Sequence, residues 1–197
     1  MTDNDRTAQL ERACSYLRRI PAWYLAMTDA SDGHQPRVRP FSFAMVDDGK
    51  LWFCTSRDKD VWAELSANPK FEVSGWKPGE CWIVLTGEAA LEDDAVASDK
   101  VRQAGFKHMV GIGEEHESAN DGRLAFFSVR NIAARFCDID GSEERLEDIS
   151  ASQLRIVADL SNVMTVGSVS VPARVYLDYN SEVGVIGEYS VVVNISR

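Results

Sequence analysis

The fold of this chain is decided by residues 36–69, which read PRVRPFSFAMVDDGKLWFCTSRDKDVWAELSANP. Side chains alternate between two faces over residues 37–46, and this period of two predicts a β-strand. The Asp-Asp-Gly sequence at 47–49 predicts a hairpin turn, and residues 50–55 form the return strand. Residues 58–67 then predict a short helix, because their apolar side chains recur at helical spacing.

Single residues within this segment predict details of its local structure. Pro40 has no backbone N–H to donate to a neighbouring strand, so its position predicts a bulge or the edge of a sheet. Asp58 precedes the helix and belongs to the residue types that cap helix N-termini. Asn68 and Pro69 end the helix, because proline cannot continue it.

Cationic side chains in the same segment indicate an anion site. Arg37 and Arg39 stand two apart on one strand and therefore share a face, and Lys59 opens the helix. Thr55 and Ser56 lie at the strand-to-helix turn, where backbone N–H groups lack helical partners. Two guanidinium groups, an ammonium group and a helix N-terminus together make a phosphate site. The residues alone leave a second interpretation open, in which both arginines are exposed and pair with surface carboxylates.

The flanking sequence predicts a mainly β protein. Strands are expected at 23–28, 71–76, 81–91, 124–130 and 132–139, helices at 7–20 and 93–104, and a polar loop at 105–122. Residues 22–139 therefore hold about six or seven strands joined by turns and short helices, which favours an antiparallel β-barrel, closed or split, over a parallel sheet.

The last quarter of the chain has a different pattern. Residues 141–148 are expected to form an acidic linker and 150–160 a helix, and the valine-, serine- and glycine-rich remainder predicts about three or four short strands. We therefore divide the chain into a barrel domain at 1–140 and a C-terminal extension at 141–197, whose role the sequence leaves open.

Composition narrows the class of protein. The formal net charge of −10 argues against a nucleic-acid-binding protein and against attachment to anionic lipid by charge. No apolar run approaches the ~20 residues that span a bilayer, and the polar start has no secretory signal. The four cysteines form no Cys-x-x-Cys pair, so we expect reduced, buried thiols in a cytoplasmic protein.

Several short motifs in fixed order resemble the pyridoxamine 5′-phosphate oxidase-like family. They are QPRVRPFSF, DDGKLWFCT, KDVWAELSANP and ECWIVLTGEA, and the likeness extends over roughly residues 10–140. The similarity is greatest to short members described as nitroimidazole-resistance-like or general-stress-like flavoproteins. The resemblance implies an FMN-binding split barrel and a homodimer with a flavin site at its interface.

The resemblance also implies roles for individual residues. Arg39 would face the phosphate or ribityl chain, and Lys59 would bind the phosphate. Trp82 falls where long members carry a residue that reaches the flavin across the dimer interface. With the anion-site residues identified above, the full set of expected cofactor contacts is Arg37, Arg39, Pro40, Phe41, Ser42, Cys54, Thr55, Ser56, Lys59 and Trp82.

Departures from the family pattern restrict the reaction. Long oxidases carry an Arg-Lys pair where this chain has Asp60 and Val61, and short members often carry an arginine where it has Val84. These differences argue against oxidation of pyridoxamine phosphate and leave FMN binding in place, with weaker anchoring of the phosphate.

The expected function is that of an FMN-dependent oxidoreductase. It would pass electrons from NADH or NADPH to a small acceptor such as a nitro compound, a quinone or free flavin. Hydride transfer to the flavin needs no general base from the protein, so no catalytic residue is assigned. Two alternatives stay open: a non-catalytic flavin-binding or storage protein, and a split barrel that uses the deazaflavin F420 or haem.

The histidines and carboxylates of residues 108–117 are assigned to a solvated loop. His108, Glu114 and His116 have no spacing typical of a metal site, so no metal is expected. Cys54, beside the expected cofactor, is interpreted as an inert buried thiol rather than a redox-active one.

Overall fold

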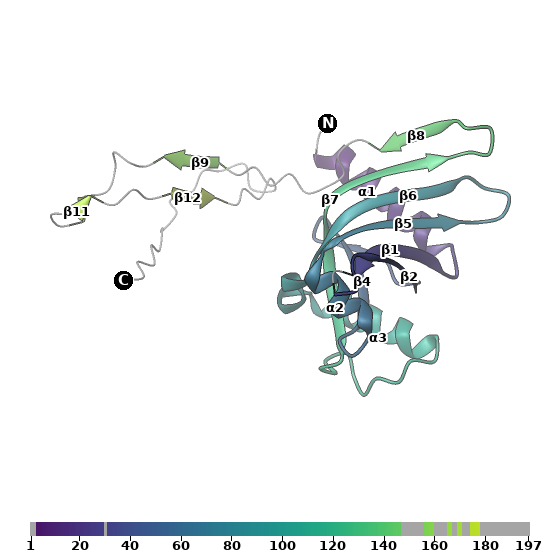
Figure 1. Cartoon of the computed structure of the whole chain (residues 1–197), viewed down its shortest axis with the longest axis horizontal. Coiled ribbons are helices and arrows are strands. Elements are labelled where there is room, and N and C mark those ends of the chain that lie inside the picture. Colours follow the sequence, from purple (N-terminus) through teal and green to yellow (C-terminus); the bar gives the residue numbers. More distant parts are fainter. Residues whose placement is uncertain are drawn as a thin grey trace. The chain divides into compact units, whose positions relative to one another are not determined.

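The computed structural model describes residues 3–29 and 31–146, and the backbone of 156–159, 165–166, 169–170 and 174–177. The chain separates into two compact units, Met1–Ala151 and Ser152–Arg197 (Figure 1). In the described part of the chain, no helix is long and apolar enough to span a membrane.

The described secondary structure of both units is mainly strand. The first unit contains α1 (Asp3–Arg18), β1 (Trp23–Asp29), β2 (Gln35–Phe41), β3 (Met45–Asp47), β4 (Lys50–Ser56), α2 (Asp60–Ala67), β5 (Lys70–Trp76), β6 (Trp82–Ala90), the 3-10 helix η1 (Leu91–Val96), α3 (Asp99–Gly111), β7 (Leu124–Cys137) and β8 (Glu143–Leu146). The second unit contains β9 (Ile156–Asp159), β10 (Thr165–Val166), β11 (Val169–Ser170) and β12 (Arg174–Leu177).

The first unit is built on one antiparallel sheet of eight strands. Its order is β2-β1-β5-β6-β7-β4-β3, with β8 added to β7, and every pairing is antiparallel. The sheet curves around a core but does not close, because β2 and β3 are not paired with each other. This arrangement confirms the predicted split antiparallel barrel with short helices. Pro40 lies on β2, the edge strand, as its missing N–H predicts.

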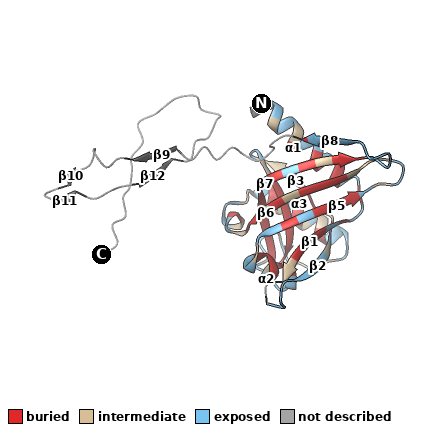
Figure 2. Cartoon of the chain, turned by 45° about the horizontal axis from the view of Figure 1, so that its top comes forward, coloured by how far each residue is buried: buried red, intermediate tan, exposed pale blue. Residues whose placement is uncertain are grey.

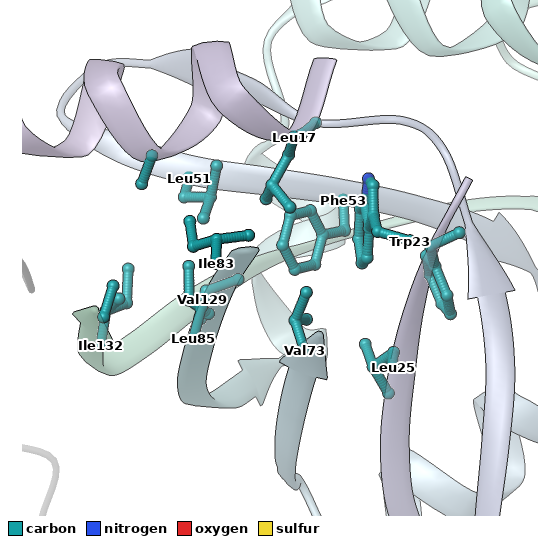
Figure 3. Close-up of a cluster of buried hydrophobic side chains, with 14 of the residues drawn as sticks. Leu17, Trp23, Leu25, Leu51, Phe53, Val73, Ile83, Leu85, Val129 and Ile132 are labelled. Carbon is teal, nitrogen blue, oxygen red and sulfur yellow. The ribbon is translucent and has the colours of Figure 1, made fainter. Parts of the chain in front are cut away.

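Aromatic side chains fill the centre of the barrel. Trp23 is fully buried, stacks on Phe41 with ring centroids 5.3 Å apart and contacts Phe53 at 4.6 Å. Figure 3 shows Leu17 of α1 pointing from the helix toward this cluster, so α1 covers one opening of the sheet. Aromatic pairs of this kind contribute about 0.5–1.5 kcal/mol each beyond the area they bury. Figure 2 shows the buried residues concentrated on the strands.

The strand predicted at 37–46 is interrupted in the structure. β2 ends at Phe41 and β3 begins at Met45, because the chain leaves its pairing with β1 and starts pairing with β4. Phe41 enters the main core, whereas Phe43 packs into a second buried cluster with Trp52 and Phe126. The change of pairing therefore separates Phe41 from Phe43, which the predicted alternation placed on one face, and the predicted strand is not continuous.

The helix predicted at 93–104 is confirmed only from Asp99 onward, and the first part of the loop predicted at 105–122 is wrong because α3 continues to Gly111. The 3-10 helix η1 ends at Val96, and α3 starts after Ser98, whose hydroxyl accepts the Val101 N–H at 3.2 Å. Gly105 does not break α3, because its missing side chain makes room for the ring of Phe126. His108, which was assigned to a loop, therefore lies on a helix.

Other local predictions also differ from the structure. Lys59, not Asp58, is the N-cap of α2. Residues 124–137 form the single strand β7 instead of the two strands predicted. Where the second strand was expected to begin, Asn131 has a φ of 51° and the pairing of β7 with β6 contains a bulge. Residues 143–146, assigned to a linker, form β8 and pair with β7.

The second unit overturns one further prediction. Part of the helix predicted at 150–160 is instead strand β9, which pairs with β12. The rest of that predicted helix lies outside the described residues. Three short strands follow β9, in agreement with the predicted strand-rich character of this segment, and its other residues are not described.

Gly105 provides a test of how α3 packs on the sheet. A Cβ atom at this position would lie 2.4 Å from Cε1 and 2.7 Å from Cζ of the buried Phe126. Gly105→Ala should therefore destabilise the protein by about 1–3 kcal/mol through overpacking, measured by urea denaturation. Gly111→Ala, on the same helix with no atom within 4 Å, should be neutral or stabilising by up to about 1 kcal/mol. Equal effects of the two substitutions would contradict this packing.

Candidate functional site

The main cavity of the first unit has a volume of about 620 Å³. It lies at the meeting point of five segments: the end of β2, the connection to β3, the end of β4, the start of α2 and the end of α3. In the view of Figure 1, α2 and α3 occupy the lower end of the unit. Its walls are formed by Pro21, Ala22, Arg39, Pro40, Phe41, Ser42, Phe43, Cys54, Thr55, Asp58, Lys59, Asp60, Val61, Met109, Ile112 and Glu114.

Most of the residues that the sequence nominated for a cofactor site line this one cavity. The seven that do so are Arg39, Pro40, Phe41, Ser42, Cys54, Thr55 and Lys59. They come from β2, the segment after it, the end of β4 and the start of α2. The antiparallel sheet separates β2 from β4 by four strands in its order, and the curvature of the barrel brings their ends together.

Three nominated residues lie elsewhere. Arg37 forms ion pairs with Asp29 at 3.2 Å and Asp32 at 2.7 Å, and lines a separate cavity of about 390 Å³. Ser56 is buried, and its hydroxyl donates to a backbone carbonyl at 3.3 Å. Trp82 is half-buried at the start of β6 and does not line the main cavity.

The two cations of the cavity are each held by a carboxylate. A terminal N–H group of Arg39 donates to Oε1 of Glu64, a side chain on α2 that is 6% exposed. The ammonium group of Lys59 donates to Glu114 at 2.6 Å. A guanidinium group has five N–H donors, so the pairing with Glu64 fixes Arg39 in place and leaves donors for a ligand.

Further charges belong to the start of α2. Asp58 and Asp60 also line the cavity, so with Glu114 its walls carry three carboxylates against two cations. The first turn of α2 adjoins the cavity and contributes the positive end of the helix dipole. The cavity wall therefore carries a few positive groups among a larger number of negative carboxylates.

Cys54 lies in the cavity wall as a protonated thiol. Burial raises its pKa well above the ordinary value for cysteine, and the side chain is only 4% exposed. A thiol that does not ionise is a poor nucleophile and a poor metal ligand. The structure thus agrees with the interpretation of Cys54 as an inert part of the wall.

The sequence did not reveal one polar contact of this site. Oγ of Ser42 and Nε2 of His108 are 2.8 Å apart, and the imidazole ring packs against Phe43 with ring centroids 5.8 Å apart. Burial lowers the pKa of His108, so its imidazole is neutral at pH 7. The spacing of Val101 and Met109 behind Ser98 was a helix signal that could have placed His108 on a helix face.

Glu114 was also assigned to the solvated loop. The structure instead places its carboxylate on Lys59 in the cavity wall. In the described part of the chain, no group of three or more His, Cys, Asp or Glu side chains is placed to hold a metal ion.

Comparison with known proteins places the first unit among characterised folds. A NimC/NimA family protein from Clostridium acetobutylicum is 29% identical, with a TM-score of 0.61 over 73% of this chain and 95% of that chain. General Stress Protein 26 from Bacillus anthracis is 16% identical, with a TM-score of 0.50 over 70% of this chain and 98% of that chain, and supports the fold alone. No curated protein sequence matches the chain.

The family itself is given by the sequence of the first unit. Residues 11–138 match the family model described as Pyridoxamine 5′-phosphate oxidase. The match runs from within α1 to just past the end of β7 and includes both strands that contribute to the cavity, β2 and β4. Because it spans more than half of the chain, the protein belongs to the pyridoxamine 5′-phosphate oxidase family.

Proposed function

We propose that the protein binds FMN in the main cavity and acts as an oxidoreductase. Electrons would pass from a reduced nicotinamide to a small acceptor, such as a nitro compound, a quinone or free flavin. The observation that carries the proposal is the convergence of seven nominated residues on one cavity in a chain of this family. The similarity to the NimC/NimA family protein supports a short member of the family.

The cavity fits the chemistry of FMN. Its volume of about 620 Å³ lies within the range of sites for small molecules and cofactors. Phe41, Phe43 and Met109 supply apolar surface for a flat ring. The cationic groups of Arg39 and Lys59 supply the charge that a phosphate needs.

Under this proposal the chain binds and orients the cofactor. Arg39 and Lys59 would hold the phosphate, and the apolar walls would keep water from the ring. The hydroxyl groups of Ser42 and Thr55 would accept or donate hydrogen bonds to its polar edge. Bound FMN would supply the two-electron chemistry, since the protein side chains carry no redox group of their own here.

The charges of the cavity support a weakly anchored phosphate. Glu114 competes for Lys59, and Asp60 stands where long oxidases carry an arginine. Each carboxylate disfavours a second anion nearby. This balance supports FMN binding over oxidation of pyridoxamine phosphate, whose phosphate would need cationic groups of its own.

The absorbance spectrum separates FMN from deazaflavin and haem, and the rate of flavin reduction separates an enzyme from a storage protein. Oxidised flavin absorbs at roughly 370 and 450 nm, a deazaflavin at roughly 420 nm, and haem gives a Soret band. Cys54 and Met109 are the lining residues of types that ligate haem iron, and the raised pKa of Cys54 makes its thiol unsuitable. A storage protein would bind FMN without speeding its reduction by NADH or NADPH beyond the rate for free flavin.

A homodimer is part of the proposal. Tyr24, Val38 and Trp76 are 54%, 55% and 53% exposed. The registers of β1, β2 and β5 put these side chains on the face of the sheet turned away from the core. Trp82 on β6 pairs with Trp76 of β5 and shares that face, so a second copy docked there would bring Trp82 toward the flavin site of its partner.

The two cations of the cavity give the first functional prediction. Arg39→Ala and Lys59→Ala should each weaken FMN binding by about 1.5–3 kcal/mol, the range for hydrogen bonds to charged groups. Flavin fluorescence on titration measures the dissociation constant. Arg37→Ala is the matched control, because Arg37 is on the same strand but outside the cavity, and it should change the constant by less than about threefold. Equal losses at Arg37 and Arg39 would place the phosphate elsewhere.

Glu114 gives the second functional prediction. Glu114→Gln should tighten FMN binding by about 1.4- to fivefold, because it frees Lys59 from an ion pair worth about 0.2–1 kcal/mol. Glu115→Gln makes the same change of net charge outside the cavity and should leave the FMN dissociation constant unchanged. Tighter binding in both variants would point to overall charge rather than to release of Lys59.

The dimer gives a third functional prediction. Val38→Glu should convert a dimer to a monomer, measured by light scattering after size-exclusion chromatography, because it places a charge on the proposed contact face. Ile139→Glu makes the same change at a residue that is 84% exposed on the β7–β8 hairpin and should leave the mass unchanged. A monomeric wild-type protein would contradict the proposal.

A further inference from the structure

We propose that Ser42 and His108 form a proton relay that delivers a proton to the electron acceptor in the main cavity. The proposal rests on the proposed oxidoreductase function and adds to it a source for the proton that reduction of a quinone consumes. Neither residue was identified as a proton donor from the sequence, since Ser42 was nominated as a cofactor contact and His108 was assigned to a loop.

The relay is defined by one contact across the fold. Ser42 follows the last residue of β2 and lines the cavity, and His108 lies on α3 behind it. The 2.8 Å separation of Oγ and Nε2 is a hydrogen-bond distance, so a proton can pass between the two groups without movement of the chain.

The surrounding structure holds both partners in place. Asp47 in the β3–β4 hairpin accepts hydrogen bonds from Ser98 at 2.7 Å and from Lys100 at 2.6 Å, which fixes the start of α3. Further along α3, Gly105 lies directly against Phe126. The His108 ring itself packs on Phe43, which directly follows Ser42 in the chain. Phe43 belongs to the second buried cluster.

The protonation state of His108 suits transfer through its ring. Burial lowers its pKa, so the ring is neutral at pH 7 and carries one N–H group and one lone pair. The ring is only half-buried, which leaves it within reach of water. A neutral imidazole can therefore release a proton at one nitrogen while it gains another at the second nitrogen.

Other groups in the cavity wall are worse proton donors. The Cys54 thiol is buried and has a raised pKa. The pKa of Asp58 is lowered, above all by a side-chain hydrogen bond from Ser56, so this carboxylate is ionised at pH 7. Lys59 is paired with Glu114 and, under the proposed function, with the phosphate. The Ser42 hydroxyl, unlike these groups, has a hydrogen-bonded histidine behind it from which its proton can be replaced.

The step balances for a quinone acceptor. A hydride that originates from the reduced nicotinamide adds two electrons and one hydrogen to the quinone and leaves a hydroquinone monoanion. The Ser42 O–H bond breaks as the new O–H bond forms on the anionic oxygen. Ser42 regains a proton from Nε2 of His108, and Nδ1 of the same ring takes a proton from water.

The test compares an acceptor that needs a proton with one that does not. FMN-loaded wild type, Ser42→Ala and His108→Gln are assayed with a quinone and with ferricyanide, which takes up electrons alone. Loss of a general acid lowers a rate by about 10²–10⁴-fold, so quinone reduction should fall at least about 100-fold in both variants. Ferricyanide reduction should stay within about twofold of wild type in His108→Gln, because His108 does not line the cavity, and all rates are measured at saturating FMN because Ser42→Ala also removes a proposed flavin contact. His34→Asn is the control, because His34 is exposed in the β1–β2 turn at φ 63°, a conformation that asparagine tolerates.

A second measurement uses the protein without FMN. The chain contains three histidines, so the ring ¹⁵N resonances of His108 are assigned by comparison with His108→Gln. Ser42→Ala should shift the Nε2 resonance of His108 and leave those of His34 and His116 in place, because only His108 loses a hydrogen-bond partner.

Each outcome decides the proposal. Selective loss of quinone reduction together with the Nε2 shift supports the relay. Unchanged quinone reduction, or equal loss with both acceptors, overturns the relay while FMN binding still stands. An unmoved Nε2 resonance shows that the pair does not form. Failure of the wild type to bind FMN overturns the proposed function, and the relay falls with it.

Discussion

The arrangement of the first unit depends on the way two phenylalanines, two residues apart, enter two different cores. Phe41 packs beside Trp23 inside the barrel, and Phe43 packs with Trp52 and Phe126 under α3. A continuous strand could not serve both clusters, since β2 pairs with β1 and β3 pairs with β4. The chain therefore breaks between Phe41 and Met45. That break opens the sheet and forms one wall of the main cavity.

The same break determines what the cavity can present to a ligand. Ser42 lies between the two phenylalanines, so its hydroxyl is held between the barrel and α3 and meets His108. Arg39, two residues before Phe41, lies at the edge of the cavity and is fixed by the buried carboxylate of Glu64. Packing of the aromatic rings thus positions the polar groups that line the cavity.

The charges of the cavity are arranged by partners that are distant in the chain. Glu64 on α2 holds Arg39, 25 residues away, and also lies 3.9 Å from Arg37, while Glu114 after α3 holds Lys59, 55 residues away. These pairs lower the cost of placing cations in a partly buried site. They also moderate the attraction of the site for a phosphate, which is consistent with a cofactor site that differs from that of the long oxidases at Asp60.

Much of the fold was determined by the sequence alone. The period-two pattern, the Asp-Asp-Gly turn and Pro40 predicted the β2–β3–β4 region and the edge strand, because these signals act between neighbouring residues. The ordered motifs also indicated the family that the comparison of residues 11–138 established. Predictions failed where distant packing overrode local preference, as at Gly105, where a glycine inside α3 accommodates Phe126 instead of ending the helix.

Only the tertiary structure decided which side chains form the site. Arg37 and Arg39 are equivalent by spacing, yet Asp29 and Asp32 draw the first away, while Glu64 fixes the second beside the cavity. Ser42 and His108 are 66 residues apart, so no local pattern could pair them. Sequence spacing fixes the direction of a side chain relative to its own strand or helix, whereas its partners depend on which elements the folded barrel brings into contact.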